Sequence, residues 1–250
     1  MTVARFLSLA AVAILTAGCT SNTATKADTT LTVSAASSLT EAFTALAAEF
    51  EASHPGVDVA LNFAGSSALA EQVNSGAPVD VLATASQSTM DVVTAAGNAT
   101  DPTVFARNQL IVVAPSSNEA GVAALADLER PGVLTAICAP DVPCGAATAT
   151  LLEDNDLAIT AATLDPDVKS VLSRVIADEV DAGIVYVTDA RAAGDAVTTV
   201  QIPSGTNVST DYLAAVVADS PHPGLAGEFV TLLSGAAGRG TLAELGFLSP

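Results

Sequence analysis

Four short stretches combine Ser, Gly or Pro with the start of an apolar helical pattern, and together they could bind an anion. The stretches are Ser37-Ser38-Leu39, Gly65-Ser66-Ser67, residues 140–150 and Asp165-Pro166-Asp167-Val168. The first turn of a helix has N–H groups without intrahelical partners and carries about half a positive charge, so it attracts anions. None of the four stretches contains Lys or Arg. We therefore expect four helix starts to converge on one small oxyanion.

The local sequence around Ser38 also allows a purely structural role. Ser37 or Ser38 can cap the helix whose apolar stripe runs over residues 39–50, and Glu41 is placed to close a capping box on Ser38. A basic residue, Lys169, follows the fourth stretch, and we expect its side chain to point outward from the first helical turn.

Catalysis by Ser38 or Ser66 has little support in the sequence. The chain has no Gly-x-Ser-x-Gly elbow, which presents the nucleophile in many hydrolases. Both histidines, His54 and His222, lie beside prolines in predicted loops, without a triad partner or a cluster of metal ligands nearby. Binding is therefore favoured over an enzyme, and a structural protein with ordinary helix caps remains the other alternative.

The composition limits the class of partner. The chain has 250 residues, enough for two modest domains, and its net charge is −19, with 8 Lys and Arg against 27 Asp and Glu. Nucleic acid and anionic membrane surfaces are disfavoured, because phosphate binding needs a basic face. An anionic ligand would have to be held by local dipoles in a closed site.

The N-terminal segment has the features of an export signal. Arg5 precedes an apolar run of about 12 residues, which is too short to span a bilayer. The run ends in Leu15-Thr16-Ala17-Gly18-Cys19, which resembles a bacterial lipobox although Thr16 stands where Leu is preferred. The sequence predicts a signal peptide over 1–18 and a lipidated Cys19 with a flexible tether over 19–30. An ordinary secretory signal is the alternative.

Two further cysteines, Cys138 and Cys144, flank the start of the third stretch. In an exported protein, an even pair this close in sequence indicates a disulfide. Such a bond would fix the loop ahead of the helix that begins near Gly145. Two free thiols are the alternative.

The order of predicted elements indicates an α/β fold. Predicted strands lie at residues 31–35, 57–63, 79–83, 108–115, 133–138, 182–187, 197–202 and 211–217. Helical patterns separate most of them, as in a mostly parallel sheet flanked by helices. We expect a discontinuous first lobe over 31–109 plus 202–250, a second lobe over 110–201, and a cleft between them.

Several motifs, taken together, resemble a known family. They are Ala35-Ala36-Ser37-Ser38-Leu39-Thr40, Asn62-Phe63-Ala64-Gly65-Ser66-Ser67, Gly76-Ala77-Pro78-Val79-Asp80-Val81, residues 108–115, Val142-Pro143-Cys144-Gly145, Asp167-Val168-Lys169 and residues 183–190. Their order and spacing over about 31–248 resemble the molybdate-binding proteins of ABC importers, a branch of the type II periplasmic solute-binding proteins. The resemblance implies a two-lobed fold with the ligand cleft between the lobes.

The resemblance also implies which residues hold the oxyanion. By motif, the hydroxyl donors are Ser38 and Ser66 in one lobe and Tyr186 in the other, and the backbone N–H donors are Cys144 and Val168. All five would contact oxygen atoms of the anion and would not be direct metal ligands. The family usually has Ala where this chain has Cys144, a change that a backbone donor tolerates.

The implied function is capture of molybdate, and also tungstate, by an exported lipoprotein on the outer face of the cell membrane. The protein would act as a monomer without a cofactor and without enzymatic activity, and would deliver its ligand to an ABC permease with its ATPase. A binding protein for another tetrahedral oxyanion, such as sulfate, is the alternative.

Overall fold

The computed structural model describes residues 29–250. The predicted signal peptide, the lipidation of Cys19 and most of the tether lie outside these residues. The last two tether positions, Thr29 and Thr30, instead open the first strand and pair with Val57 and Asp58. Within 29–250, no helix is long and apolar enough to cross a membrane.

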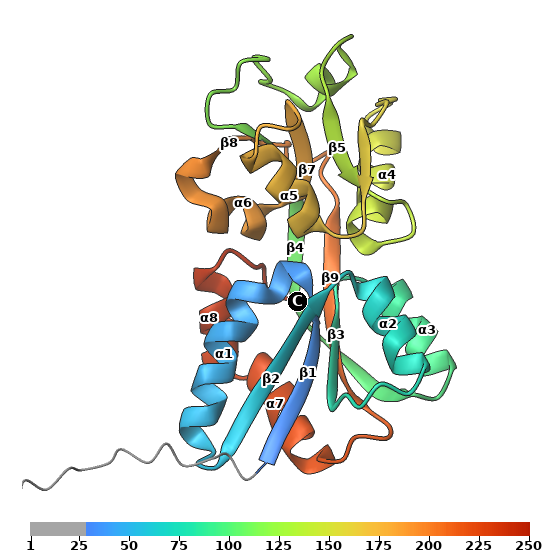
Figure 1. Cartoon of the computed structure of the whole chain (residues 1–250), viewed down its shortest axis with the longest axis vertical. Coiled ribbons are helices and arrows are strands. Elements are labelled where there is room, and N and C mark those ends of the chain that lie inside the picture. Colours follow the sequence, from blue (N-terminus) through green and yellow to red (C-terminus); the bar gives the residue numbers. More distant parts are fainter. Residues whose placement is uncertain (1–28) are drawn as a thin grey trace, which may run out of the picture.

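Two sheets stacked along the long axis form the two lobes of an α/β molecule (Figure 1). The sheet of the lower lobe has the order β2-β1-β3-β9-β4. Its strands are β1 (Thr29–Ala36), β2 (Val57–Ala64), β3 (Val81–Thr84), β4 (Ala99–Pro115) and β9 (Ser209–Val217). The pairs β1·β2 and β1·β3 are parallel, whereas β9 is antiparallel to both β3 and β4.

The long strand β4 belongs to both sheets. Its first part, from Ala99 to Gln109, pairs with β9, and from Leu110 onward it pairs with β7 and β8. The upper sheet continues through β7 to β5 and β6, which are parallel to one another. Its other strands are β5 (Thr135–Cys138), β6 (Thr163–Asp165), β7 (Ala182–Tyr186) and β8 (Val197–Val200). Strand β4 therefore carries the chain from one lobe into the other.

Helices flank each sheet. In the lower lobe they are α1 (Thr40–Ser53), α2 (Ser66–Asn74), α3 (Gln87–Ala95), α7 (Pro223–Ser234) and α8 (Ala236–Glu244), with the 3-10 turn η1 (Ser37–Leu39) before α1. In the upper lobe they are α4 (Pro143–Asp154), α5 (Val168–Ile176) and α6 (Val187–Ala193), with the short turns η2 (Leu125–Glu129) and η3 (Gly194–Ala196).

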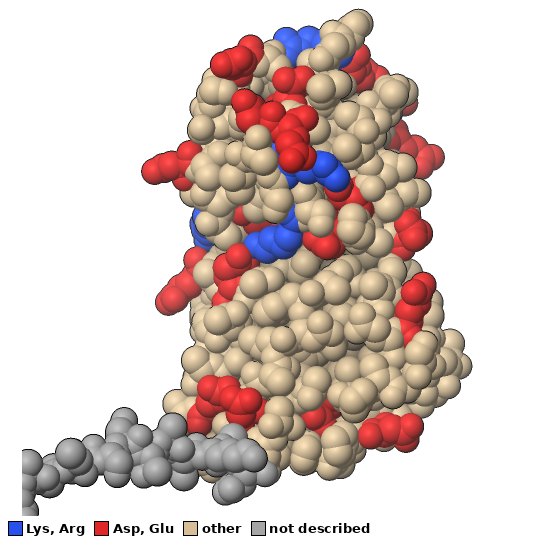
Figure 2. Space-filling view, viewed as in Figure 1, with Lys and Arg blue, Asp and Glu red and all other residues tan. Residues whose placement is uncertain are grey.

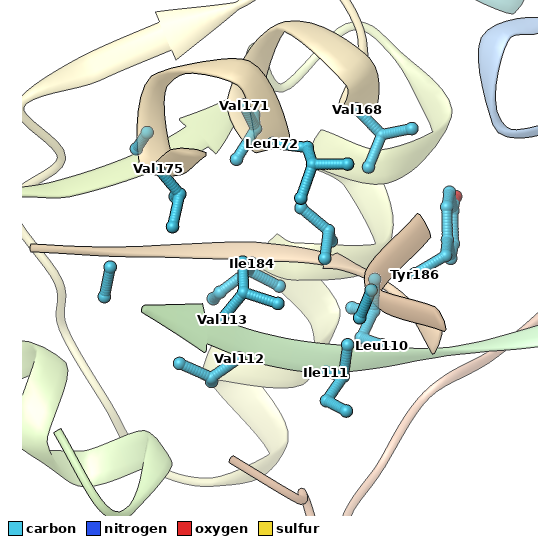
Figure 3. Close-up of a cluster of buried hydrophobic side chains, with 14 of the residues drawn as sticks. Leu110, Ile111, Val112, Val113, Val168, Val171, Leu172, Val175, Ile184 and Tyr186 are labelled. Carbon is cyan, nitrogen blue, oxygen red and sulfur yellow. The ribbon is translucent and has the colours of Figure 1, made fainter. Parts of the chain in front are cut away.

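Each lobe has its own aliphatic core. One buried cluster draws its members from residues 110–202, and the two others draw theirs from 31–106 and 212–247. In the upper lobe, one face of α5 packs Val168, Val171 and Val175 over strands β4 and β7 (Figure 3). Tyr186 lies at one end of this cluster, at the last position of β7. The core thus fixes α5 and β7 relative to one another, and the start of α5 and the end of β7 both lie at the boundary between the lobes.

Candidate functional site

A small, partly open cavity lies where the helix starts of both lobes meet. It is lined by Ala36, Ser37, Ser38, Gly65, Ser66, Ala85, Val142, Pro143, Cys144, Pro166, Asp167, Val168 and Tyr186. The five residues predicted from the sequence to bind the anion are all among them. Each of the four predicted helix-start stretches provides at least one residue of the lining. The space open to the centre of a water-sized sphere is about 10 Å³, so the cavity suits one small solute and not a sugar or an amino acid.

Ser38 reaches the cavity from a 3-10 turn and not from a helix cap. Residues 37–39 form η1, so α1 begins only at Thr40, and its N-cap, Leu39, has no side-chain cap hydrogen bond. The predicted capping box between Ser38 and Glu41 is therefore wrong, because the extra turn moves Ser38 away from the capping position. Instead the Ser38 hydroxyl lies 2.8 Å from the hydroxyl of Tyr212 on β9, and both are buried.

Ser66 is the first residue of α2 and is almost fully buried. Its hydroxyl oxygen accepts a hydrogen bond from the main-chain N–H of Ala85, at 3.1 Å. The preceding Gly65 is the N-cap, and a Cβ atom on it would lie 2.5 Å from the carbonyl oxygen of Pro166 in the other lobe. The two lobes therefore touch closely beside the cavity.

Cys144 lies in the first turn of α4. Pro143 occupies the first helical position and has no N–H, so Cys144 provides the first N–H that the helix offers to the cavity. The predicted disulfide from Cys138 to Cys144 is present, with 5.7 Å between the two Cα atoms. It folds the loop onto the helix so tightly that a Cβ atom on Gly145 would lie 1.8 Å from the carbonyl oxygen of Ala139. This position requires glycine.

Val168, another residue of the cavity lining, provides the first N–H of α5. Its neighbour Asp167 is the only acidic residue in the cavity lining of the described chain, but its carboxylate is turned to the helix and accepts from the Ser170 N–H at 3.0 Å. This cap fixes the helix start while the N–H of Val168 stays without an intrahelical partner.

Tyr186 closes the cavity from the end of β7. Its side chain is 1% exposed, and its hydroxyl lies near the hydroxyls of Thr210 and Tyr212 but forms no well-aligned hydrogen bond with any residue of 29–250. Burial raises the pKa of this phenol well above its usual value, so the hydroxyl keeps its proton. A buried hydroxyl without a well-aligned hydrogen bond is costly, so this proton is available to a ligand in the cavity.

Lys169 does not point outward as the sequence suggested. Its ammonium lies 2.7 Å from Glu41 Oε1 on α1 and 3.2 Å from Asp189 Oδ1 on α6, so it links the two lobes. Burial disfavours its charge, but the two carboxylates outweigh this and raise the pKa of Lys169. Both carboxylates come from distant parts of the chain, so helical periodicity around Lys169 could not reveal them.

Sequence reasoning also missed Tyr212 and Asp189. Tyr212 is part of an apolar strand pattern, and nothing in its neighbourhood marks it as a partner of a residue 174 positions away. Asp189 follows the strand that ends at Tyr186, and that proximity in sequence was the one available signal. Neither histidine lines the cavity: His54 pairs with Glu228, and the His222 N–H donates to Asp80.

The chain matches known proteins over nearly its whole described length. Residues 31–248 match the family described as bacterial extracellular solute-binding protein. The chain is 41% identical over 221 residues to the molybdate-binding protein ModA of Mycobacterium tuberculosis (strain ATCC 25618 / H37Rv), covering 88% of this chain and 85% of the relative.

Solved structures share the fold at lower identity. The periplasmic molybdate-binding protein of Azotobacter vinelandii superposes with a TM-score of 0.77 at 19% identity, over 88% of this chain and 99% of that chain. The sulfate-binding protein SubI of Mycobacterium tuberculosis H37Rv gives a TM-score of 0.77 at 20% identity, over 88% and 86%. These likenesses show the two-lobed fold of periplasmic binding proteins. The chain therefore belongs to the bacterial extracellular solute-binding protein family, whose members bind solutes and are not enzymes.

Proposed function

We propose that the protein captures molybdate, and also tungstate, in the cavity between its lobes and delivers it to an ABC importer. One observation carries the proposal: both lobes place groups that can donate hydrogen bonds in the cavity lining, while the carboxylate of Asp167 caps its own helix. The donors are the hydroxyls of Ser38, Ser66 and Tyr186 and the first-turn N–H groups of Cys144 and Val168. The 41% identity to a molybdate-binding protein supports the choice of molybdate among oxyanions.

The charge distribution explains why the donors must be local. The net charge is −19, and the basic side chains at mid-height in Figure 2, near the level where the lobes meet, have acidic neighbours. Lys169 and Arg174 are both paired with carboxylates. No Lys or Arg lines the cavity within residues 29–250. A dianion in this site is stabilised instead by hydroxyls and by helix starts, and each helix start carries about half a positive charge.

The donor set selects among oxyanions by protonation and size. Molybdate is a tetrahedral dianion without a proton at neutral pH, so every oxygen can accept. Phosphate carries a proton that would need an acceptor, and a cavity wall of donors leaves that proton unpaired. Sulfate has the same charge and shape but is smaller, so only cavity size can reject it. Tungstate is nearly the size of molybdate, and we expect poor discrimination between them.

Binding should bring the lobes together. We propose that 31–109 plus 202–250 and 110–201 act as the two bodies, each supplying part of the donors, and that the anion favours the closed arrangement through contacts with both. The closed form would be the one that the permease, with its ATPase, recognises. We further propose that the protein acts as a monomer, held at the outer face of the membrane by a lipid on Cys19.

Calorimetric titration tests this proposal. A form of the protein that begins at residue 20 is titrated with molybdate, tungstate, sulfate and phosphate. We expect tight one-to-one binding of the first two, weakened at least tenfold by Ser38→Ala and by Ser66→Ala, because each removes a hydrogen bond to a charged group. Binding of sulfate alone would keep the oxyanion mechanism and change the ligand. If none of the four anions binds, the proposal is wrong.

A further inference from the structure

We propose that Tyr212 is a positioning residue that orients the hydroxyl of Ser38, so that Ser38 can only donate to the bound anion. This inference rests on the proposed function, and it assigns part of the selectivity to a residue outside the cavity lining. Its basis is the 2.8 Å contact between the hydroxyl oxygens of Ser38 and Tyr212, in a pair that is buried on both sides.

Proton counting fixes the direction of this hydrogen bond. A serine hydroxyl has one proton and two lone pairs. A fully ionised oxyanion only accepts, and a hydrogen bond to it is about twice as strong as a neutral one. When the anion is bound, the Ser38 proton therefore goes to the anion. The remaining contact must then run from the Tyr212 hydroxyl to the oxygen of Ser38.

The second serine shows the same arrangement made from the main chain. The Ser66 oxygen already accepts from the Ala85 N–H at 3.1 Å, so its proton is left for the cavity. A main-chain N–H can never accept, which makes this orientation permanent. Tyr212 has the corresponding place beside Ser38, where no main-chain N–H of the described residues donates to the hydroxyl.

Tyr212 is held firmly enough for this role. Its side chain is fully buried, and its ring makes edge contacts with Tyr186, Phe105 and Phe247 at centroid distances of 5.9, 6.4 and 5.3 Å. Burial raises the pKa of the Tyr212 phenol well above its ordinary value, so the proton stays on the hydroxyl at physiological pH. The ring packing would survive removal of the hydroxyl alone.

The orientation has a consequence for selectivity. While Tyr212 donates to Ser38, the serine cannot accept a proton from a ligand without breaking that bond. Without the Tyr212 hydroxyl, Ser38 is free to rotate and to accept from a protonated oxyanion such as hydrogen phosphate. The Tyr212→Phe variant should therefore lose affinity for molybdate while rejecting phosphate less strictly.

A double-mutant cycle tests the inference. Dissociation constants for molybdate and phosphate are measured for the full chain, for Tyr212→Phe, and for the same change in the Ser38→Ala and Ser66→Ala backgrounds. We expect about a tenfold loss of molybdate affinity from Tyr212→Phe in the unaltered protein and in the Ser66→Ala variant, and less than twofold in the Ser38→Ala variant. The ratio of phosphate to molybdate affinity should rise at least fivefold.

Each other outcome is informative. An equal loss in both serine backgrounds, with an unchanged ratio between the two anions, would mean that Tyr212 only supports the packing and would overturn the inference. Unchanged affinity in Tyr212→Phe would overturn it as well, while leaving the proposed function intact. If the unaltered protein binds sulfate and not molybdate, the same double-mutant cycle is carried out with dissociation constants for sulfate in place of those for molybdate. If it binds no oxyanion, the proposed function fails, and this inference with it.

Discussion

The two lobes contribute to the cavity by different means. The lower lobe offers the side-chain hydroxyls of Ser38 and Ser66, each held by a neighbouring hydroxyl or N–H. The upper lobe offers the main-chain N–H groups of Cys144 and Val168, with one phenol from Tyr186. A side-chain donor can be changed by one substitution, whereas a main-chain donor depends on how its helix starts. The lower-lobe part of the site therefore depends on the identity of single residues, whereas the upper-lobe part depends mainly on local backbone structure.

The upper half can be tested by removing a single N–H. Val168 is the first residue of α5, where proline fits the helix, and Asp167 before it is already extended. Val168→Pro should weaken molybdate binding about 100-fold, because it removes one hydrogen bond to a charged group and leaves the helix in place. Val168→Ala is the control, since it shortens the side chain and keeps the N–H. Equal affinities of the two variants in calorimetry would contradict a donor role for this N–H.

The upper lobe also carries a buried charge that should make its stability depend on pH. Burial raises the pKa of Asp189 from 3.8 to about 6, even though Lys169 opposes this. The folded state therefore takes up a proton at a higher pH than the unfolded state. The free energy of unfolding should fall by about 2 kcal/mol as pH rises from about 4 to about 7, and should change little above that range through this group.

Urea unfolding of the unaltered protein and of Asp189→Asn at pH 4 and pH 7 measures this contribution. The free energy of unfolding of the unaltered protein, relative to that of Asp189→Asn, should be lower at pH 7 than at pH 4. Asp58→Asn, at an exposed position of the lower lobe, serves as the control for removing one negative charge, and its effect is subtracted from that of Asp189→Asn. If the remaining difference is the same at both pH values, the assignment of the buried charge is wrong.

The disulfide should matter for the upper half of the site alone. Replacing Cys138 and Cys144 together by Ala should lower the free energy of unfolding by about 2 kcal/mol, because it frees a short loop in the unfolded chain. The N–H of residue 144 remains, so molybdate should still bind, with lower affinity. A reductant should destabilise the unaltered protein and leave the double variant unchanged. Equal stability of the two forms without reductant would contradict this prediction.

The smallest effect on molybdate binding is expected at Gly65, where the two lobes touch. A Cβ atom on Gly65 would lie 2.5 Å from the Pro166 carbonyl oxygen, so Gly65→Ala should hold the lobes slightly apart. We expect about tenfold weaker molybdate binding, mainly through faster dissociation, as measured by stopped-flow displacement. Gly227→Ala, where the new Cβ atom meets nothing within 4 Å, is the matched control. If Gly227→Ala weakened molybdate binding as much as Gly65→Ala, the contact between the lobes at Gly65 would not explain the effect.

Much of the fold could be predicted because its signals are local. Strand β1 alternates between apolar and polar residues from Leu31 to Ser34, and β7 is a short, fully buried run that is mostly apolar. The core stripe of α5 follows from helical spacing. The predicted outward direction of Lys169 failed because its partners, Glu41 and Asp189, lie on other helices. The capping box on Ser38 failed because local sequence did not distinguish a 3-10 turn from a helix cap.

The sequence by itself determined which residue types could bind an anion and that Ser66, Cys144 and Val168 lie in the first turns of helices. It also favoured a bond between Cys138 and Cys144 over two free thiols, and the structure contains that bond. Only the tertiary structure decided that the four helix starts meet in one cavity, that Tyr212 orients Ser38, and that Lys169 links the lobes. The reason is physical: helix starts and turns depend on neighbouring residues, whereas burial and hydrogen-bond direction depend on residues brought together from distant parts of the chain.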